Sequence, residues 1–139
     1  MSRIGKEKTV PNLLHGDITE RIIGAAYEVY NILGYGFLEK VYENALVLEL
    51  RGYGLDVKQQ HPITVVYKGE VIGEYFTDLI VEDRVIVEVK SVSALDPAHE
   101  VQLVHYLKAT KLEVGLLINF GKEIKIMRKI LSKKENMIE

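Results

Sequence analysis

Apolar residues along the first third of the chain recur with a helical period. From residue 18 to residue 33 they return every three or four positions, which predicts an amphipathic helix. Asp17 is expected to cap this helix, with Glu20 placed to reach back to its start. After Gly34-Tyr35-Gly36, the same spacing predicts a second helix over about residues 38–50.

The period then changes to the alternation that is typical of strands. Strands are expected near residues 56–60, 62–67, 71–81 and 84–91, with tight turns at Lys68-Gly69 and at Glu82-Asp83-Arg84. Asp96-Pro97 opens a third helix, about 97–109. The apolar run 112–120 predicts a strand covered on both faces, and a last strand follows at 123–131. The predicted fold is α/β in the order ααββββαββ: a mixed sheet flanked by helices, with a crossover helix between two central strands.

The composition fits one globular domain. Of 139 residues, 47% are hydrophobic and 27% charged, which is enough for one core. We expect a single domain over residues 15–132, a flexible arm at 1–14 and a frayed end at 133–139. Neither a membrane-spanning run nor a secretory signal is visible. The absence of cysteine excludes a disulfide framework and a thiolate zinc site. A cytoplasmic location without membrane contact is therefore expected.

The charge is distributed unevenly around a net value of −2. Residues 105–139 hold eight Lys or Arg against four Glu, whereas residues 1–104 hold ten against sixteen acidic residues. Such asymmetry suits a partner with phosphates on one side and carboxylates that bind metal near it. The simpler alternative is a solvated C-terminal strand, which charge alone favours.

The candidate chemistry lies at Asp78 and at Glu88-Val89-Lys90. Residues two apart on a strand face the same side, so Glu88 and Lys90 project together, away from the neighbouring valines. The alternative is a cross-strand salt bridge on an exposed face. A turn of three residues, 82–84, would place Asp78 opposite Glu88 and let both carboxylates share one cation, whereas a turn of two residues would separate them.

A Glu-x-Lys triplet has no weight by itself, because about 1.4 such triplets are expected by chance at this composition. The chain contains a second one, Glu123-Ile124-Lys125, and Glu113 precedes it by ten residues, as Asp78 precedes Glu88. Only the first triplet is followed by a helix that carries a glutamine, Gln102. The surrounding motifs therefore have to separate the two triplets.

The order Asp78, Glu88-Val89-Lys90 and then Gln102 to Tyr106 on a helix resembles the PD-(D/E)XK nuclease superfamily. More narrowly, Gly36 to Tyr42 resembles the motif of the small bacterial GxxExxY family. The resemblance also includes segments 99–102 and 115–121, and it spans roughly residues 17–131. Thr77 stands where the superfamily name has proline.

The resemblance implies a restriction-endonuclease-like fold that hydrolyses phosphodiester bonds of nucleic acid, DNA in the first place, with Mg²⁺ or Mn²⁺. The implied metal ligands are Asp78, Glu88, the carbonyl of Val89 and Glu39. Lys90 would orient or help to deprotonate the attacking water, and Gln102 would hold Lys90 or a phosphate. Tyr106, Lys108 and Lys125 are the implied substrate-binding residues. Without the resemblance, Glu39 would be a charge favoured at a helix start, and core packing explains Tyr106 equally well.

Two other classes of function stay open on the sequence. The fold can serve as a nucleic-acid-binding module without turnover, or as a protein-interaction domain, since one fold hosts many functions. A homodimer is a further expectation, because a domain of this size offers limited surface to grip a duplex.

Overall fold

The computed structural model describes residues 13–132, and the expectations for residues 1–12 and 133–139 lie outside this part. The elements are α2 (Gly16–Leu33), α3 (Glu39–Gly52), β1 (Val57–Tyr67), β2 (Glu70–Val81), β3 (Val85–Lys90), α4 (Pro97–Thr110), β4 (Val114–Phe120) and β5 (Ile124–Ile130). Within these residues, no helix has the length and apolar character that crossing a membrane requires.

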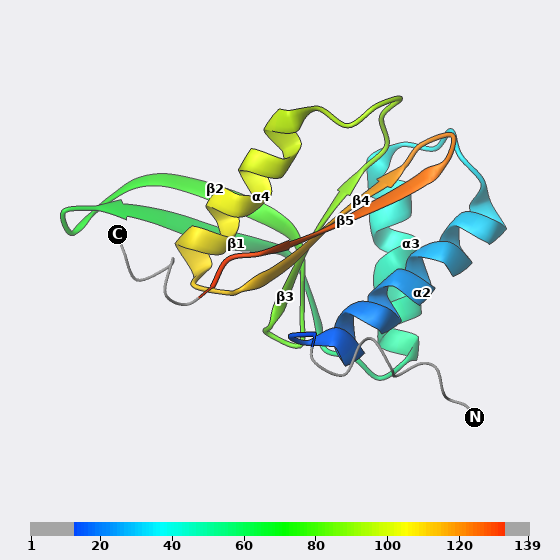
Figure 1. The fold of residues 1–139 in the computed structure, drawn as a ribbon, viewed down its shortest axis with the longest axis horizontal. Coiled ribbons are helices and arrows are strands. Elements are labelled where there is room, and N and C mark those ends of the chain that lie inside the picture. Colours follow the sequence, from blue (N-terminus) through cyan, green and yellow to red (C-terminus); the bar gives the residue numbers. More distant parts are fainter. Residues whose placement is uncertain (1–12, 133–139) are drawn as a thin grey trace.

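The five strands form one mixed sheet in the order β1-β2-β3-β4-β5 (Figure 1). Neighbouring strands are antiparallel except β3 and β4, which run parallel. A parallel pair needs a crossover connection, and α4 provides it, as predicted. The α/β class and the mixed sheet flanked by helices are therefore confirmed.

One detail of the predicted strand order was wrong, because the expected strands 56–60 and 62–67 are one continuous strand, β1. Gln60 adopts a positive φ of 53° without shifting the register against β2. Pro62 is tolerated because β1 is an edge strand, where only the N–H groups that face the single partner strand take part in the sheet. A local break in the pattern was thus mistaken for the end of a strand.

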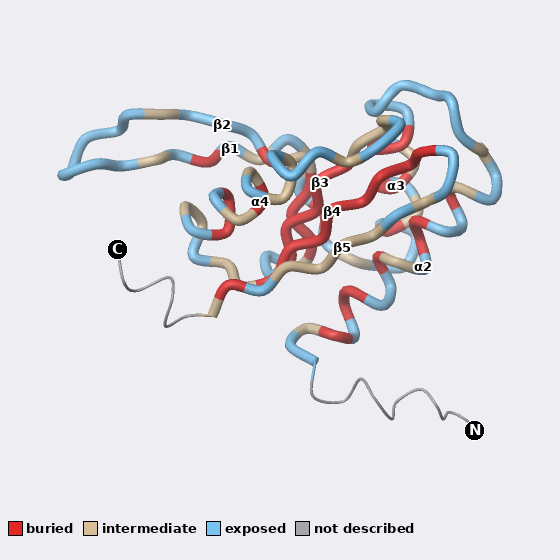
Figure 2. Tube along the Cα trace, turned by 45° about the horizontal axis from the view of Figure 1, so that its top comes forward, coloured by how far each residue is buried: buried red, intermediate tan, exposed pale blue. Residues whose placement is uncertain are grey.

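The helices cover opposite faces of the sheet (Figure 1). Helices α2 and α3 pack on the face that carries Val85, Val87 and Val89. Helix α4 packs on the other face, against Ile86 and Leu117. Strands β3 and β4 are buried along almost their whole length (Figure 2), which confirms the expectation that the apolar run 112–120 is covered on both sides.

A two-stranded extension reaches beyond the body of the sheet (Figures 1 and 2). Strand β3 pairs with β2 only from Leu79 to Val81, so residues 62–76, here called the hairpin arm, are paired only with each other. The Lys68-Gly69 turn closes it, as predicted. The arm carries six exposed large apolar residues: Val66, Tyr67, Val71, Ile72, Tyr75 and Phe76.

The helix starts were predicted with mixed success. The Asp96-Pro97 start of α4 is confirmed, with a capping box between Asp96 and His99. The cap assigned to Asp17 was wrong. The carbonyl of His15 already accepts hydrogen bonds from Ile18 and Thr19, so α2 begins two residues earlier than predicted and Asp17 lies inside its first turn.

Candidate active site

The turn between β2 and β3 has the length that brings Asp78 and Glu88 together. Val81 pairs with Val85 and Leu79 with Val87, so the loop has three residues. Its first two residues, Glu82 and Asp83, have positive φ angles of 55° and 54°, the geometry of a tight hairpin turn. The register predicted from strand parity is confirmed.

Beyond Leu79 the two strands separate, and the carboxylates take the place of the backbone ladder. The Asp78 N–H donates to Glu88 Oε2 at 3.0 Å, and the Val89 N–H donates to Asp78 Oδ2 at 2.8 Å. Each carboxylate thus reaches across to the backbone beside the other. The two side chains converge, as the sequence argument required.

Glu88 is only 4% exposed, so the salt bridge on an exposed face is excluded as an explanation for the triplet. Burial, followed by the negative charge of Asp78, raises the pKa of Glu88 to about 7. Burial also raises the pKa of Asp78, and the charges of Glu43 and Glu39 add to this rise. The hairpin therefore holds two acidic groups whose ionisation the surroundings disfavour.

Thr77, at the position of the proline in the superfamily name, is completely buried. Its hydroxyl donates to Glu88 Oε2, the same oxygen that accepts from the Asp78 N–H. Threonine at this position therefore supplies a donor that proline cannot. Together the two donors fix the Glu88 carboxylate beside Asp78.

The donor set fits a hard divalent cation. The buried Glu88 and the half-buried Asp78 both have raised pKa values, so a positive charge between them stabilises their ionised forms, and carboxylate oxygens suit Mg²⁺ and Mn²⁺. Within residues 13–132, no three acidic or histidine side chains converge closely enough to form a metal site. The structure therefore brings Asp78 and Glu88 together but does not gather Glu39 with them.

A buried glutamate of α3, which the sequence argument missed, is linked to this pair. Glu43 is 3% exposed and accepts hydrogen bonds from Lys40, Gln59 and Gln60. Gln60 Nε2 also donates to Asp78 Oδ1 at 3.3 Å, which links Glu43 to Asp78. The available signal was the spacing of Glu39 and Glu43, which places both on one helical face.

The GxxExxY segment is held against the end of β3. Tyr42 is completely buried and donates to the carbonyl of Gly34 at 2.6 Å, while its ring stacks on Phe120 at 4.5 Å. Gly36 has a φ of +115°, which L side chains rarely adopt. The Ser91 hydroxyl donates to the Phe37 carbonyl at 2.9 Å. The motif tyrosine thus has a packing role that fixes the start of α3.

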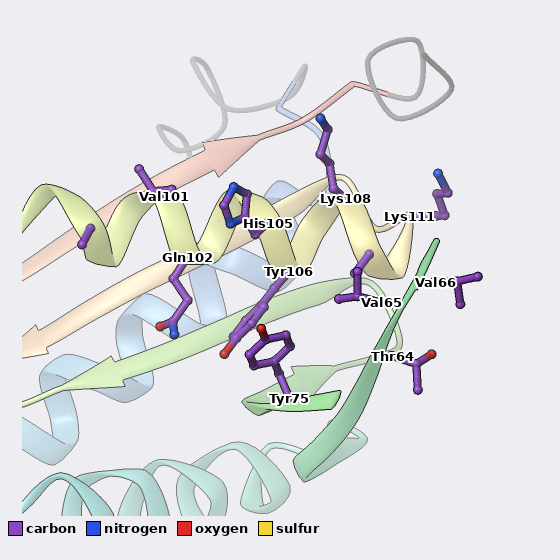
Figure 3. A pocket seen from close by; sticks show the side chains of 12 residues that line it. Thr64, Val65, Val66, Tyr75, Val101, Gln102, His105, Tyr106, Lys108 and Lys111 are labelled. Atoms are coloured by element: carbon purple, nitrogen blue, oxygen red, sulfur yellow. The ribbon is translucent and has the colours of Figure 1, made fainter. Parts of the chain in front are cut away.

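The remaining predicted residues lie in three places. Gln102, Tyr106 and Lys108 line a groove between α4 and the hairpin arm (Figure 3). Lys90 lies beside Glu88, where its positive charge lowers the pKa of that carboxyl. Lys125 lies elsewhere, on β5, and forms an ion pair with Glu123 at 3.6 Å. Glu123 is 81% exposed, so the second triplet offers no buried carboxylate.

Fold and site together define an α/β protein of restriction-endonuclease-like architecture with a convergent carboxylate pair at the β2–β3 hairpin. The family model described as the PD-(D/E)XK nuclease superfamily matches residues 16–130, so the chain belongs to that superfamily. The match covers every helix and strand described above.

Two solved structures are similar to this chain, and both are distant from it in sequence. The protein in "Crystal structure of SSO0001" aligns with a TM-score of 0.55 and 19% identity over 88% of this chain. This chain spans only 62% of that protein's length. An alkaline exonuclease (LHK-Exo) from Laribacter hongkongensis aligns with a TM-score of 0.46 and 12% identity, over 84% of each chain. A comparison with curated proteins finds no significant match.

Proposed function

We propose that this protein is a nuclease that hydrolyses phosphodiester bonds of DNA with the help of Mg²⁺ or Mn²⁺. The observation that carries the proposal is the convergence of the Asp78 and Glu88 carboxylates across the β2–β3 hairpin. Paired carboxylates whose pKa values are raised by burial and by each other's charge are typical of functional sites.

In this proposal Asp78 and Glu88, with the carbonyl of Val89, hold the cation. The cation supplies Lewis-acid stabilisation of the charge that develops on the phosphate. Lys90 shares a face with Glu88, and in this proposal its ammonium would orient the attacking water and stabilise negative charge near the carboxylates. Gln102 positions Lys90 or a phosphate from the facing helix.

We also propose that the chain belongs to the GxxExxY group within the superfamily, on the strength of Gly36, Glu39 and Tyr42. The charge of Glu39 contributes to the raised pKa of Asp78, which supports a role near the cation. Glu39 would then act from outside the first ring of ligands, for example on a bound water. A homodimer stays a prediction, to be tested by light scattering.

The direct test is a cleavage assay. Single-stranded, duplex and branched DNA are incubated with the protein in Mg²⁺, in Mn²⁺ and in EDTA. We expect cleavage with either cation and none in EDTA. A Glu88→Ala preparation, purified identically, excludes contaminating nucleases, and Glu123→Ala is the matched control from the second triplet. Metal-dependent cleavage that survives in Glu88→Ala would contradict the assignment, and binding without cleavage would favour a silent binding module.

Substitution of the lysine in each of the two Glu-x-Lys triplets is expected to affect a different step, turnover for Lys90 and DNA binding for Lys125. Lys125 pairs with Asn119, which pairs with Lys90, so both lysines share a face about 10 Å apart. Lys90→Ala should lower the turnover rate by about a hundredfold. Lys125→Ala should leave turnover at saturating DNA nearly unchanged and weaken binding through a lost phosphate contact. Equal losses of turnover would mean that the wrong triplet was chosen.

A further inference from the structure

A groove of about 860 Å³ separates the hairpin arm from α4 (Figure 3). Thr64, Val65, Val66 and Tyr75 form its arm side, and residues from Ala98 to Lys111 form its helix side. Tyr75 reaches from the arm toward Tyr106 on the helix, with Gln102 beside them (Figure 3). The groove thus brings an aromatic pair together with a chain of polar and basic side chains.

We propose that this groove binds a single strand of nucleic acid, with a base against Tyr75 and phosphates near Lys108 and Lys111, and leads the strand to the carboxylate pair. The inference rests on the proposed nuclease function and deepens it. It names a single-stranded segment, rather than an intact duplex, as the form of substrate that the site accepts.

The size of the groove favours a single strand. Its volume lies within the roughly 300–1,000 Å³ of pockets that hold small ligands. A few nucleotides of one strand fit such a space, whereas a double helix does not enter it. The hairpin arm extends beyond the part of β2 that pairs with β3. In this proposal it forms the wall that excludes the second strand of a DNA duplex.

Tyr75 is prepared for stacking. It is 51% exposed, and its ring centre lies 6.2 Å from that of Tyr106, at an angle of 40°. The ring also lies across Gly73, where an added Cβ would stand only 3.3 Å from it. Tyr75 is therefore supported on two sides and offers its remaining surface to the groove. Stacking of bases on such rings binds single strands with little sequence preference.

The charges that line the groove complement a phosphate backbone. Lys108 and Lys111 lie at the C-terminal end of α4, and His105 lies one turn before Lys108. None of the twelve described residues that line the groove is acidic. The lining therefore combines apolar and aromatic surface with positive charge alone, the combination found in grooves that bind single strands.

Two residues of the groove lie near the candidate active site. Tyr106 packs in one cluster with Ile86, which precedes Glu88 by two residues on β3, and Tyr75 precedes Asp78 by three residues on β2. Tyr106 lines the groove, and the pKa of Tyr106 is raised by burial and then by the charges of Glu88 and Asp78. The two carboxylates therefore act on a residue of the groove wall. A strand that stacks on Tyr75 would place a neighbouring phosphodiester close to these carboxylates.

Binding is tested by fluorescence anisotropy in EDTA, where no cleavage is expected. The probes are a labelled single strand of about 12 nucleotides, within the range that one binding groove covers, and a duplex of the same sequence. We expect tighter binding of the single strand. Tyr75→Ala should weaken it about tenfold, from the loss of one stacked base, whereas Tyr75→Phe should keep it. Lys108→Ala should reduce the slope of log K against log salt by about 0.7.

Tyr67→Ala is the matched control, because Tyr67 is an exposed tyrosine on the same arm but outside the groove lining. Its single-strand affinity should equal that of wild type. Tighter binding of duplex, no binding of either probe, or equal affinity of Tyr75→Ala and wild type would overturn the inference. If the single strand binds as expected but is not cleaved in Mg²⁺ or Mn²⁺, the nuclease proposal fails while the groove assignment stands.

Discussion

Asp78→Asn is expected to lower the rate of DNA cleavage by about three orders of magnitude. The amide keeps an oxygen that can accept from the Val89 N–H, so the hairpin geometry is retained. The substitution removes the negative charge that would hold the cation. Stabilisation of the transition state by the cation is worth several kcal/mol, and each loss of about 1.4 kcal/mol lowers the rate tenfold. The measurement is the initial rate at saturating Mn²⁺, with the fold checked by circular dichroism.

Asp83→Asn is the matched control for this substitution. Asp83 lies in the turn of the same hairpin, where it forms an exposed ion pair with Lys58 at 2.6 Å. Its positive φ suits asparagine equally well, so cleavage should stay at the wild-type rate. In EDTA, Asp78→Asn should also unfold at a higher temperature than wild type, since one of two repelling charges is gone. Wild-type cleavage by Asp78→Asn would refute the assignment of the cation site.

The register of β2 and β3 could be predicted from the sequence, because the alternation of apolar residues alone determines it. The alternation of valines on β3 and of Leu79 and Val81 on β2 allowed only a turn of odd length to bury all of them on one face. The same parity placed Asp78 opposite Glu88. Site geometry could therefore be predicted together with the core, because both depend on the same register.

Features that depend on distant contacts could not be predicted. Glu43 is buried because Gln59 and Gln60 of β1 donate to it, and no local pattern marks that encounter. A glutamate on a helix is usually solvated, so nothing in the local sequence marks Glu43 as buried. The groove likewise depends on the unequal lengths of β2 and β3, which leave Tyr75 facing α4 instead of a third strand.

The second large effect is expected in the stability of the metal-free protein as a function of pH. The pKa of Glu88 rises from its ordinary value of 4.5 to about 7 in the folded state. Between these values the folded protein keeps a proton that the unfolded chain has lost, so stability falls as the pH rises. The total loss is on the order of 3 kcal/mol. The raised pKa of Asp78 acts in the same direction.

Thermal unfolding in EDTA at pH 5 and at pH 8 measures this effect against Glu88→Gln, which cannot ionise at this position. The difference between wild type and the variant cancels the contributions of the histidines and of the other carboxylates to the pH dependence of stability, because these groups are present in both proteins. Wild type should lose on the order of 10 °C more than the variant between the two pH values. Mn²⁺ at pH 8 should restore wild type and leave the variant nearly unchanged, because a cation that binds only the folded state stabilises it. Parallel pH profiles of the two proteins would show that the folded hairpin tolerates both charges without a cation. Asp78 and Glu88 would then have no electrostatic need for a cation between them.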